Sequence, residues 1–294
     1  MLETMAQKSM VDGMEVEVHD FSESYKNPKL YAAKIASTSF DRTEDDIHNP
    51  DKLWEVLKTE ANGRAGSVLE FVWSETNLIL PKKYQHYENY AFSTNGHYKL
   101  ETKFVNFRCI ENIQLETGET FTIKEKQKKN PVLTFKLSLP IFVLRHIIRH
   151  RQASWMEVSR RRAESKFSFN IPNRILDFKD PFIEHLIKKT FEDCENAYNN
   201  LRDRGVPKEL ARMVIPPALN TTTWVQFRNP VCDESWFNFI YQRLDKKAQF
   251  ETRELVAIMK ELGENYLFNT FGESYMKDYN TEKNNYKKFM KYRS

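Results

Sequence analysis

The sequence has few glycines, few cysteines and no long apolar run. Only 8 of the 294 residues are glycine, and neither G-x-G-x-x-G nor G-x-x-x-x-G-K-[ST] occurs, so a glycine-rich nucleotide loop is not expected. The three cysteines, Cys109, Cys194 and Cys232, have no C-x-x-C spacing, which argues against a disulfide framework and a zinc knuckle. Without an apolar signal core or a run of about 18 apolar residues, we expect neither secretion nor membrane insertion, and a cytoplasmic location.

Charge and size bound the function further. With 40% hydrophobic and 29% charged residues, the chain has the composition of a folded globular protein of one large domain or two small ones. The net charge of +4 is smaller than the excess typical of a dedicated nucleic-acid binder. It suits small anionic ligands such as nucleotides.

The residue pattern indicates a mixture of helices and strands without the regular alternation of a doubly wound fold. Two strands are predicted at Val105–Ile113 and Phe121–Lys126, around the turn Glu116–Glu119, and a third at Val132–Leu137. We predict one domain over residues 1–294, with a β insertion at 74–131 and a polar surface tail at 273–294. Residues 1–15 carry no clear pattern, and residues 152–162 have the composition of a loop. Helices are expected at 27–40, 50–60, 139–151, 181–204, 207–213, 234–247 and 248–270.

The densest chemistry lies between Arg149 and Arg162, where Arg-His-Arg closes a predicted helix and Glu157, Ser159 and Arg161 alternate in the segment after it. Arginine presents a planar fork of donors that matches phosphate. Such a cluster could hold a phosphate and a second anionic group together. A solvated basic surface is the alternative.

This cluster resembles the signature of the flavin-dependent thymidylate synthase family. Arg149-His150-Arg151 is followed, after seven residues, by Ser159, and the further positions Ser154, Glu157 and Arg161 stand at the family's offsets. The resemblance extends along most of the chain outside residues 74–131 and the tail. It includes Ser39-Phe40, Ala211-Arg212, and Asn238 to Arg243 before Ala248-Gln249.

The resemblance, together with the coarse pattern, implies an α/β (α+β) fold with a central, largely antiparallel sheet flanked by helices and an inserted β-hairpin element. It implies reductive methylation of dUMP to dTMP with FAD, methylenetetrahydrofolate and NADPH. It also implies a homotetramer whose active sites are shared between subunits. None of the cysteines lies in the signature, which agrees with a family that needs no protein nucleophile.

The resemblance also assigns roles to residues. Arg243 is expected to activate the pyrimidine, because a guanidinium can stabilise an anion without itself titrating. The residues expected to bind FAD are Arg149, His150, Arg151, Glu157, Asn238 and Ser39. The residues expected to bind the pyrimidine deoxynucleotide are His146, Arg149, Glu157, Ser159, Arg160, Arg161, Arg212 and Arg243.

Five positions depart from the family's pattern. Phe71 replaces a flavin-associated histidine, His146 a nucleotide-binding glutamine, Met156 an asparagine and Arg162 a tyrosine, while Glu234 falls near a frequent arginine. Several of these positions belong to the expected pockets. A related flavin- and folate-dependent hydroxymethyl transferase acting on a pyrimidine deoxynucleotide is therefore an alternative function.

Two other readings of the cluster remain. His146 and His150 have the i, i+4 spacing of metal ligands, but the glutamate of H-E-x-x-H and a third ligand are missing, so no metal is expected. A nucleic-acid-binding module could use the arginines with Trp155 as a stacking surface. The modest net charge and the matches at Arg212 and Arg243 argue against it. Taken singly, Arg212 could complement a helix dipole, Arg243 could be an exposed helix charge, and Asn238 a surface amide.

Overall fold

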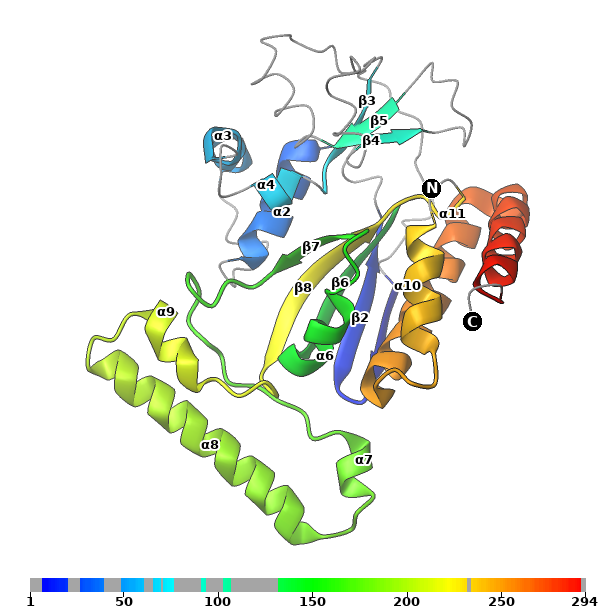
Figure 1. Ribbon diagram of the computed structural model, residues 1–294. Helices are drawn as coiled ribbons and strands as arrows, with labels where there is room; N and C mark the ends of the chain where they lie inside the picture. Colours follow the sequence, from blue (N-terminus) through cyan, green and yellow to red (C-terminus); the bar gives the residue numbers. More distant parts are fainter. Residues whose placement is uncertain are drawn as a thin grey trace.

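The central element is an antiparallel sheet with the strand order β1-β2-β6-β8-β7 (Figure 1). Its strands are β1 Gln7–Val11, β2 Met14–His19, β6 Leu133–Pro140, β7 Ser154–Glu157 and β8 Asn220–Phe227. Every pairing between them is antiparallel. The predicted sheet is therefore confirmed. The computed structural model describes residues 7–20, 27–39, 49–60, 66–69, 71–76, 91–93, 103–106, 132–231 and 234–291.

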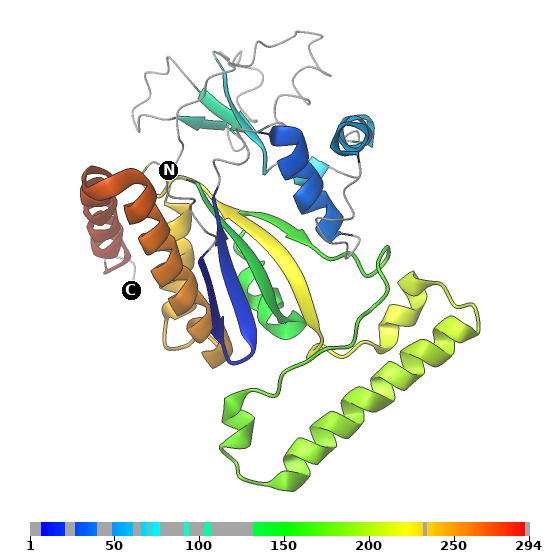
Figure 2. The same cartoon turned by 180° about the vertical axis from the view of Figure 1, so that it is seen from behind.

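Helices pack on both faces of this sheet (Figures 1 and 2). On one face, Phe135, Phe227 and Trp236 belong to a core shared by the sheet, α6 (Ile141–Ile147), α10 (Ser235–Leu244) and α11 (Phe250–Lys291). On the other face, Trp224 and Met156 pack against α2 (Pro28–Thr38), α3 (Pro50–Glu60) and α4 (Gly66–Leu69). Along β7 and β8, neighbouring side chains that point to opposite faces thus belong to two separate cores.

A third group of helices projects from the sheet as an arm (Figure 1). It consists of α7 (Asn173–Leu176), α8 (Pro181–Asp203), α9 (Lys208–Ala211) and the 3-10 turn η3 (Arg212–Val214). Helix α8 begins where the Asp180 side chain accepts a hydrogen bond from the Phe182 N–H, and Gly205 follows its end with φ +80°. Both ends agree with the predicted helix at 181–204. No helix in the described part of the chain is long and apolar enough to cross a membrane.

The hairpin of β1 and β2 lies largely within residues 1–15, where no element was predicted. Its two-residue turn, Asp12-Gly13, has positive φ at both positions, +50° and +76°, as a type I′ turn requires. The Gly13 carbonyl accepts a hydrogen bond of 2.7 Å from Asn170 Nδ2. The turn therefore also anchors the segment that leads to α7.

Replacing Gly13 by alanine is expected to destabilise the protein by about 2–3 kcal/mol in urea unfolding. A Cβ there meets a positive φ and lies 2.3 Å from Asn170 Cγ. Gly205→Ala is the matched control, since φ is also positive but nothing lies within 4 Å. It should cost about 1 kcal/mol. Equal losses in the two variants would show that the Asn170 contact has no energetic weight.

The predicted helix 139–151 and the loop after it are wrong at their boundaries. Leu139 and Pro140 end β6, the helix runs only from Ile141 to Ile147, and residues 154–157 form β7. The cause is tertiary structure. The first N–H groups of α6 donate to carbonyls of residues 217 and 219, and β7 pairs with β8, a strand that the sequence did not predict.

Three short strands lie at or within the predicted β insertion at 74–131, of which the structure describes only residues 74–76, 91–93 and 103–106. Strands β3 (Trp73–Thr76), β4 (Ala91–Ser93) and β5 (Lys103–Asn106) form a small antiparallel sheet in the order β3-β5-β4. Residues 105 and 106 of the predicted strand Val105–Ile113 lie in β5. The rest of that strand, the turn at Glu116–Glu119 and the strand Phe121–Lys126 lie outside the described residues.

Residues 273–291, part of the segment predicted as a polar surface tail, form the second part of a helix. Gly272 interrupts α11 with φ +79°, and the helix then continues to Lys291. Tyr279 and Tyr286 of this second part are 0% and 6% exposed. Trp236 Nε1 donates to the Tyr279 hydroxyl over 3.1 Å, and that hydroxyl donates to Glu264 Oε1 over 3.0 Å. The many lysines and asparagines concealed an amphipathic helix whose tyrosines complete the core.

Candidate functional site

The Arg-His-Arg turn between α6 and β7 is docked on α10. The His150 ring is 4% exposed and lies against Phe227 and Phe239, with ring centroids 5.9 and 5.3 Å away. Its Nε2 lies 3.2 Å from Ser235 Oγ, and that hydroxyl donates to the Gln152 carbonyl over 2.8 Å. Because the Ser235 proton is used in this way, His150 Nε2 is the donor to Ser235 Oγ. The buried imidazole therefore anchors the Arg149–Gln152 turn to α10 and β8.

This environment keeps His150 neutral. Burial, and secondly the positive charge of Arg243, lower the pKa of His150 from 6.5 to about 4. Arg149 and Arg151, on either side of the histidine, are both exposed. The turn thus presents two guanidinium groups to solvent around one buried, uncharged ring. The predicted flavin contact of His150 stays a prediction.

Because His150 is buried and neutral, the free energy of unfolding should decrease as the pH falls. The unfolded chain binds a proton near pH 6.5 and the folded chain only near pH 4, so stability is present above pH 6.5 and is lost as the pH falls towards 4. The loss should amount to roughly 3 kcal/mol in urea unfolding between these pH values. His150→Gln should flatten the slope, whereas His185→Gln, an exposed position on α8, should keep it. An unchanged slope in His150→Gln would contradict the assignment.

Arg243, in the last turn of α10, stands close to this turn. Burial and the positive charge of Arg149 both lower the pKa of its guanidinium. Its Nε is buried and has no hydrogen-bond partner among the described residues. Two cations that repel each other, one with an unused buried donor, favour an anionic ligand between them.

A pocket of about 590 Å³ lies between α6, β7 and the α9–η3 segment. Three arginines, Arg145, Arg160 and Arg212, line it together with Glu157. Its remaining lining residues are Ile141, Leu144, Ile148, Glu209, Leu210, Met213 and Ile215. Three guanidinium groups beside an apolar wall fit an anionic group attached to a less polar ring or sugar.

The charged side chains of this pocket are held by specific contacts. Arg160 donates to the Asn220 carbonyl over 2.9 Å, and Arg212 Nε to the Glu209 carbonyl over 3.1 Å. Burial raises the pKa of the Glu157 carboxyl, against the opposing effects of the Thr221 hydroxyl, 3.3 Å away, and of Arg160 and Arg145. Glu157 is thus the carboxyl that the signature segment contributes to the pocket wall. The positive charges of Arg160 and Arg145 lie close enough to balance its negative charge.

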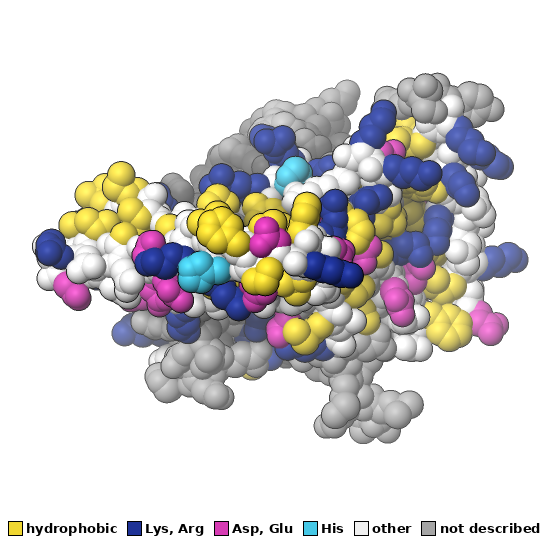
Figure 3. Space-filling view, turned by 90° about the horizontal axis from the view of Figure 1, so that it is seen from below, with side chains coloured by type: hydrophobic (Ala, Val, Ile, Leu, Met, Phe, Trp, Pro, Cys, Tyr) yellow, Lys and Arg dark blue, Asp and Glu magenta, His cyan; other side chains and the backbone are white. Residues whose placement is uncertain are grey.

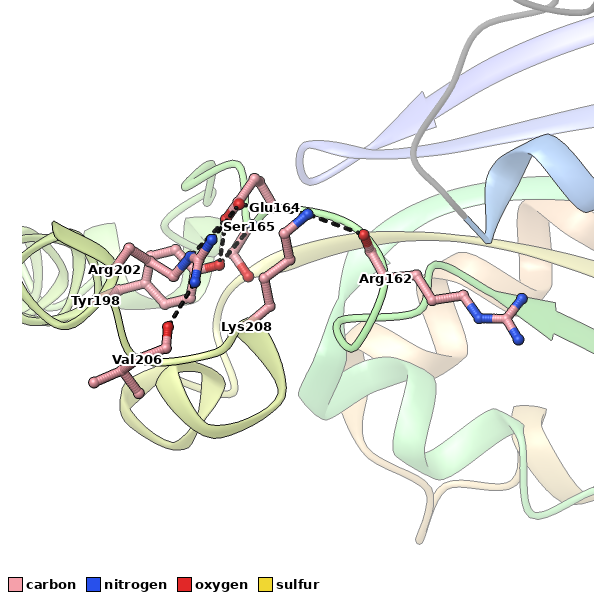
Figure 4. A network of polar contacts seen from close by, with 7 residues as sticks. All are labelled: Arg162, Glu164, Ser165, Tyr198, Arg202, Val206 and Lys208. Carbon is pink, nitrogen blue, oxygen red and sulfur yellow. Dashed lines mark hydrogen bonds and ion pairs between the residues drawn. The ribbon is translucent and has the colours of Figure 1, made fainter. Parts of the chain in front are cut away.

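A polar network joins the helical arm to the end of the signature segment (Figure 4). Lys208 Nζ donates to the Arg162 carbonyl over 3.1 Å and lies 3.4 Å from Glu164 Oε1. Arg202 NH2 donates to Glu164 Oε1 over 2.9 Å, and the Tyr198 hydroxyl donates to Glu164 Oε2 over 2.9 Å. These contacts place α9 and η3 against the signature segment, which brings Arg212 to the same pocket as Arg160.

The predicted site residues thus fall into separate places. Glu157, Arg160 and Arg212 share the pocket, while Arg149, His150, Asn238 and Arg243 gather where the turn meets α10. Ser39 lies on the opposite face of the sheet, where its carbonyl accepts from the Ser159 N–H over 3.1 Å and its hydroxyl donates to Met156 Sδ over 3.0 Å. His146, Arg151 and Arg161 are exposed, and none of them lines the pocket.

Phe71, at the position of the family's flavin-associated histidine, is fully buried beside Trp224 and Met156. Its carbonyl accepts a hydrogen bond from Gln226 Nε2 over 3.2 Å. Phe71 is therefore part of the second core. Among the described residues, no group of three His, Cys, Asp or Glu side chains could hold a metal ion.

Some site residues were not predicted. Arg145 shares a helix face with Arg149, a signal that could have marked it, whereas nothing local pointed to Gln152, Ser235 or Tyr286. Asn238 Nδ2 donates to Gln152 Oε1 over 2.9 Å, and the Tyr286 hydroxyl donates to Asn238 Oδ1 over 3.0 Å. These contacts join the signature turn, α10 and the end of α11.

Comparisons with known proteins agree with the signature. A family model described as thymidylate synthase complementing protein matches residues 128–266. Proteins named flavin-dependent thymidylate synthase are similar to the chain. The one from Kosmotoga olearia is 30% identical over 51% of this chain and 76% of its own length. The one from Thermosipho melanesiensis is 31% identical over 49% and 70%, and the one from Pseudothermotoga lettingae is 33% identical over 45% and 61%. On these matches, the chain belongs to the flavin-dependent thymidylate synthase family.

Proposed function

We propose that this chain is a flavin-dependent thymidylate synthase that converts dUMP to dTMP with methylenetetrahydrofolate, FAD and NADPH. The observation that carries the proposal is the Arg149-His150-Arg151 turn docked against Arg243, whose buried Nε lacks a partner among the described residues. The family to which the chain belongs supports the reaction. The chain matches these relatives over 61–76% of their own length, and its substrates and partners are part of the proposal.

The residues around the turn fit a flavin dinucleotide. Arg149 and Arg151 are exposed cations that suit its pyrophosphate, and Asn238 offers an amide beside them. Bound FAD would carry the hydride that completes the methyl group. The chain's own residues orient the ligands and supply positive charge, with His150 kept neutral beneath the turn. Ser39 and Glu157, which lie away from this turn, are also proposed to contact the flavin.

The pocket fits the nucleotide. Arg160 and Arg212 would bind its phosphate, with Glu157 beside the sugar or base. The other residues proposed to bind it are His146, Arg149, Ser159, Arg161 and Arg243. Because the latter residues lie outside this pocket, we propose that the sites are completed between subunits of a homotetramer.

An unpartnered apolar surface supports this assembly. Four hydrophobic side chains at the beginning of the arm, Leu176, Phe178, Phe182 and Leu186, are 45–69% exposed. Figure 3, seen from below, shows hydrophobic side chains at the surface among charged ones. Exposed apolar surface of this kind marks association sites, and identical subunits cover it by symmetry.

A related hydroxymethyl transferase is the second candidate function. It is favoured by the buried Phe71 and by Met156, which is buried against Ser39 where the family has an asparagine. An imidazole at His146 also cannot copy the paired donor and acceptor of a glutamine amide. A nucleic-acid-binding module has no such support, and a DNA titration at increasing salt would expose it.

The proposal is tested first by FAD binding. FAD at about 100 times its dissociation constant should stabilise the protein by about 2.7 kcal/mol and change the flavin fluorescence. Riboflavin, which lacks the phosphates, should bind more weakly, because the cations of the turn have no anion to contact. If saturating FAD changed neither the fluorescence nor the thermal unfolding, the proposed function would lose its main support.

A further inference from the structure

The second part of α11, after the Gly272 kink, lies beyond the residues that the family model matches. It folds back along α10, and its two buried tyrosines make different contacts. Tyr279 bonds Trp236 and Glu264 in the core. Tyr286 packs against Phe237 and Tyr241, with ring centroids 6.3 and 5.4 Å away, and its hydroxyl points at the signature side of α10.

The Tyr286 hydroxyl fixes the orientation of the Asn238 amide. Asn238 Oδ1 accepts from this hydroxyl over 3.0 Å and from Gln242 Nε2 over 2.7 Å. With its oxygen occupied by two donors, the amide turns its NH2 group to Gln152, whose Oε1 lies 2.9 Å away. An amide NH2 has two hydrogens, and the second has no acceptor among the described residues. It is available to a ligand.

Gln152 connects this amide to the cationic turn. Its side chain is held by Asn238 and its carbonyl by the Ser235 hydroxyl, so α10 fixes it at two points. Arg151 precedes it directly, and Arg149 lies two residues before Arg151 in the same turn. The direction of both guanidinium groups therefore depends on contacts that begin at Tyr286.

We propose that Tyr286 is a positioning residue for the flavin site, acting through Asn238 and Gln152. It does not touch the flavin itself. Its hydroxyl holds Asn238 with one N–H free for the ligand and keeps the Arg149–Gln152 turn in its binding conformation. This inference rests on the proposed function, because Asn238, Arg149 and Arg151 are assigned to FAD there.

The test compares two tyrosine-to-phenylalanine variants of the full chain by FAD titration, followed by flavin fluorescence. Tyr286→Phe keeps the ring and removes the hydroxyl, and should raise the Kd for FAD roughly 3- to 10-fold. Tyr279→Phe is the matched control. It also removes a buried hydroxyl from the same helix, but one that bonds Trp236 and Glu264, so it should lower Tm and leave the Kd for FAD unchanged.

A double mutant distinguishes an effect of Tyr286 that acts through Asn238 from a non-specific destabilisation of the fold. If Tyr286 acts through Asn238, adding Tyr286→Phe to Asn238→Ala should not weaken FAD binding further. An unchanged Kd in Tyr286→Phe, an equal loss in Tyr279→Phe, or an additive loss in the double mutant would each overturn the inference while the unaltered chain binds FAD. Failure of the unaltered chain to bind FAD would contradict the proposed function, and this inference with it.

Discussion

Arg243→Ala is expected to lower turnover by about 100-fold or more while FAD binding survives. Its guanidinium is half-buried at the end of α10, with an Nε that has no partner in the described part of the chain. A fixed positive charge next to the pyrimidine would stabilise negative charge that grows on the base in the transition state, an effect worth about 3 kcal/mol or more. Steady-state turnover and a separate FAD titration measure the two quantities.

Two further variants sharpen this test. Arg243→Lys should restore only part of the activity, because a point charge cannot reproduce the guanidinium fork. Arg204→Ala is the control. It removes an exposed arginine that follows the end of α8 and donates to the Asn200 carbonyl and side chain, and it should leave turnover unchanged. A loss of less than a few fold in Arg243→Ala would contradict its role in activating the base.

No cysteine should be needed for turnover. Cys194 is a free, partly buried thiol on α8, far along the chain from the signature, and Cys109 and Cys232 lie outside the described residues. Replacing all three by serine should leave most of the activity in folded protein. A variant that folds but does not turn over would mean that a thiol nucleophile operates.

Arg212→Ala should raise the KM for dUMP by roughly 10- to 100-fold, with a smaller effect on kcat. Loss of a hydrogen bond between charged groups costs about 1.5–3 kcal/mol, and Arg212 shares the pocket with Arg160 and Arg145. Arg160→Ala should also raise the KM for dUMP. It removes a hydrogen bond to the Asn220 carbonyl as well, so part of its effect should be structural. Initial rates at varied dUMP concentration separate the two kinetic constants.

The role of the phosphate can be isolated. Binding of deoxyuridine, which has no phosphate, should be weak in the unaltered chain and hardly changed by Arg212→Ala. Lys189→Ala is the control, since this lysine lies on the exposed side of α8 and pairs with Asp193. If Arg212→Ala weakened dUMP and deoxyuridine by the same factor, the arginine would contact the sugar or base, and the phosphate would have to bind elsewhere.

The parts of the fold with local signals were predictable. Asn27 caps α2 and Asp180 caps α8, and both helices begin with proline at the positions that the sequence indicated. The β1–β2 hairpin also has a local signal, because Asp12-Gly13 separates two segments in which polar and apolar residues alternate. No strand was predicted there. By contrast, β7 exists because β8 pairs with it from 66 to 72 residues away, which no local pattern shows.

The candidate site divides in the same way. The family resemblance marked Arg149, His150, Glu157, Arg160 and Arg212, and the structure brings the last three to one pocket. It could not show that His150 is buried, because the covering residues, Phe227, Phe239 and Ser235, come from β8 and α10.

Long-range packing also explains why the contact between Tyr286 and Asn238 was not predicted. The composition of residues 273–294 is that of a solvated tail, and only the reversal at Gly272 brings Tyr286 to α10. A buried tyrosine every seventh residue, at 279 and 286, was the one available sign of a packed helix face.

Identification of the reaction products shows directly whether this chain makes dTMP from dUMP. The full chain is incubated with methylenetetrahydrofolate, FAD and NADPH, and with either dUMP or dCMP, and the nucleotides are identified by mass spectrometry. We expect dUMP to be converted to dTMP, dCMP to be left unchanged, and omission of FAD to abolish the product. A hydroxymethylated nucleotide, or conversion of dCMP in place of dUMP, would contradict thymidylate synthesis.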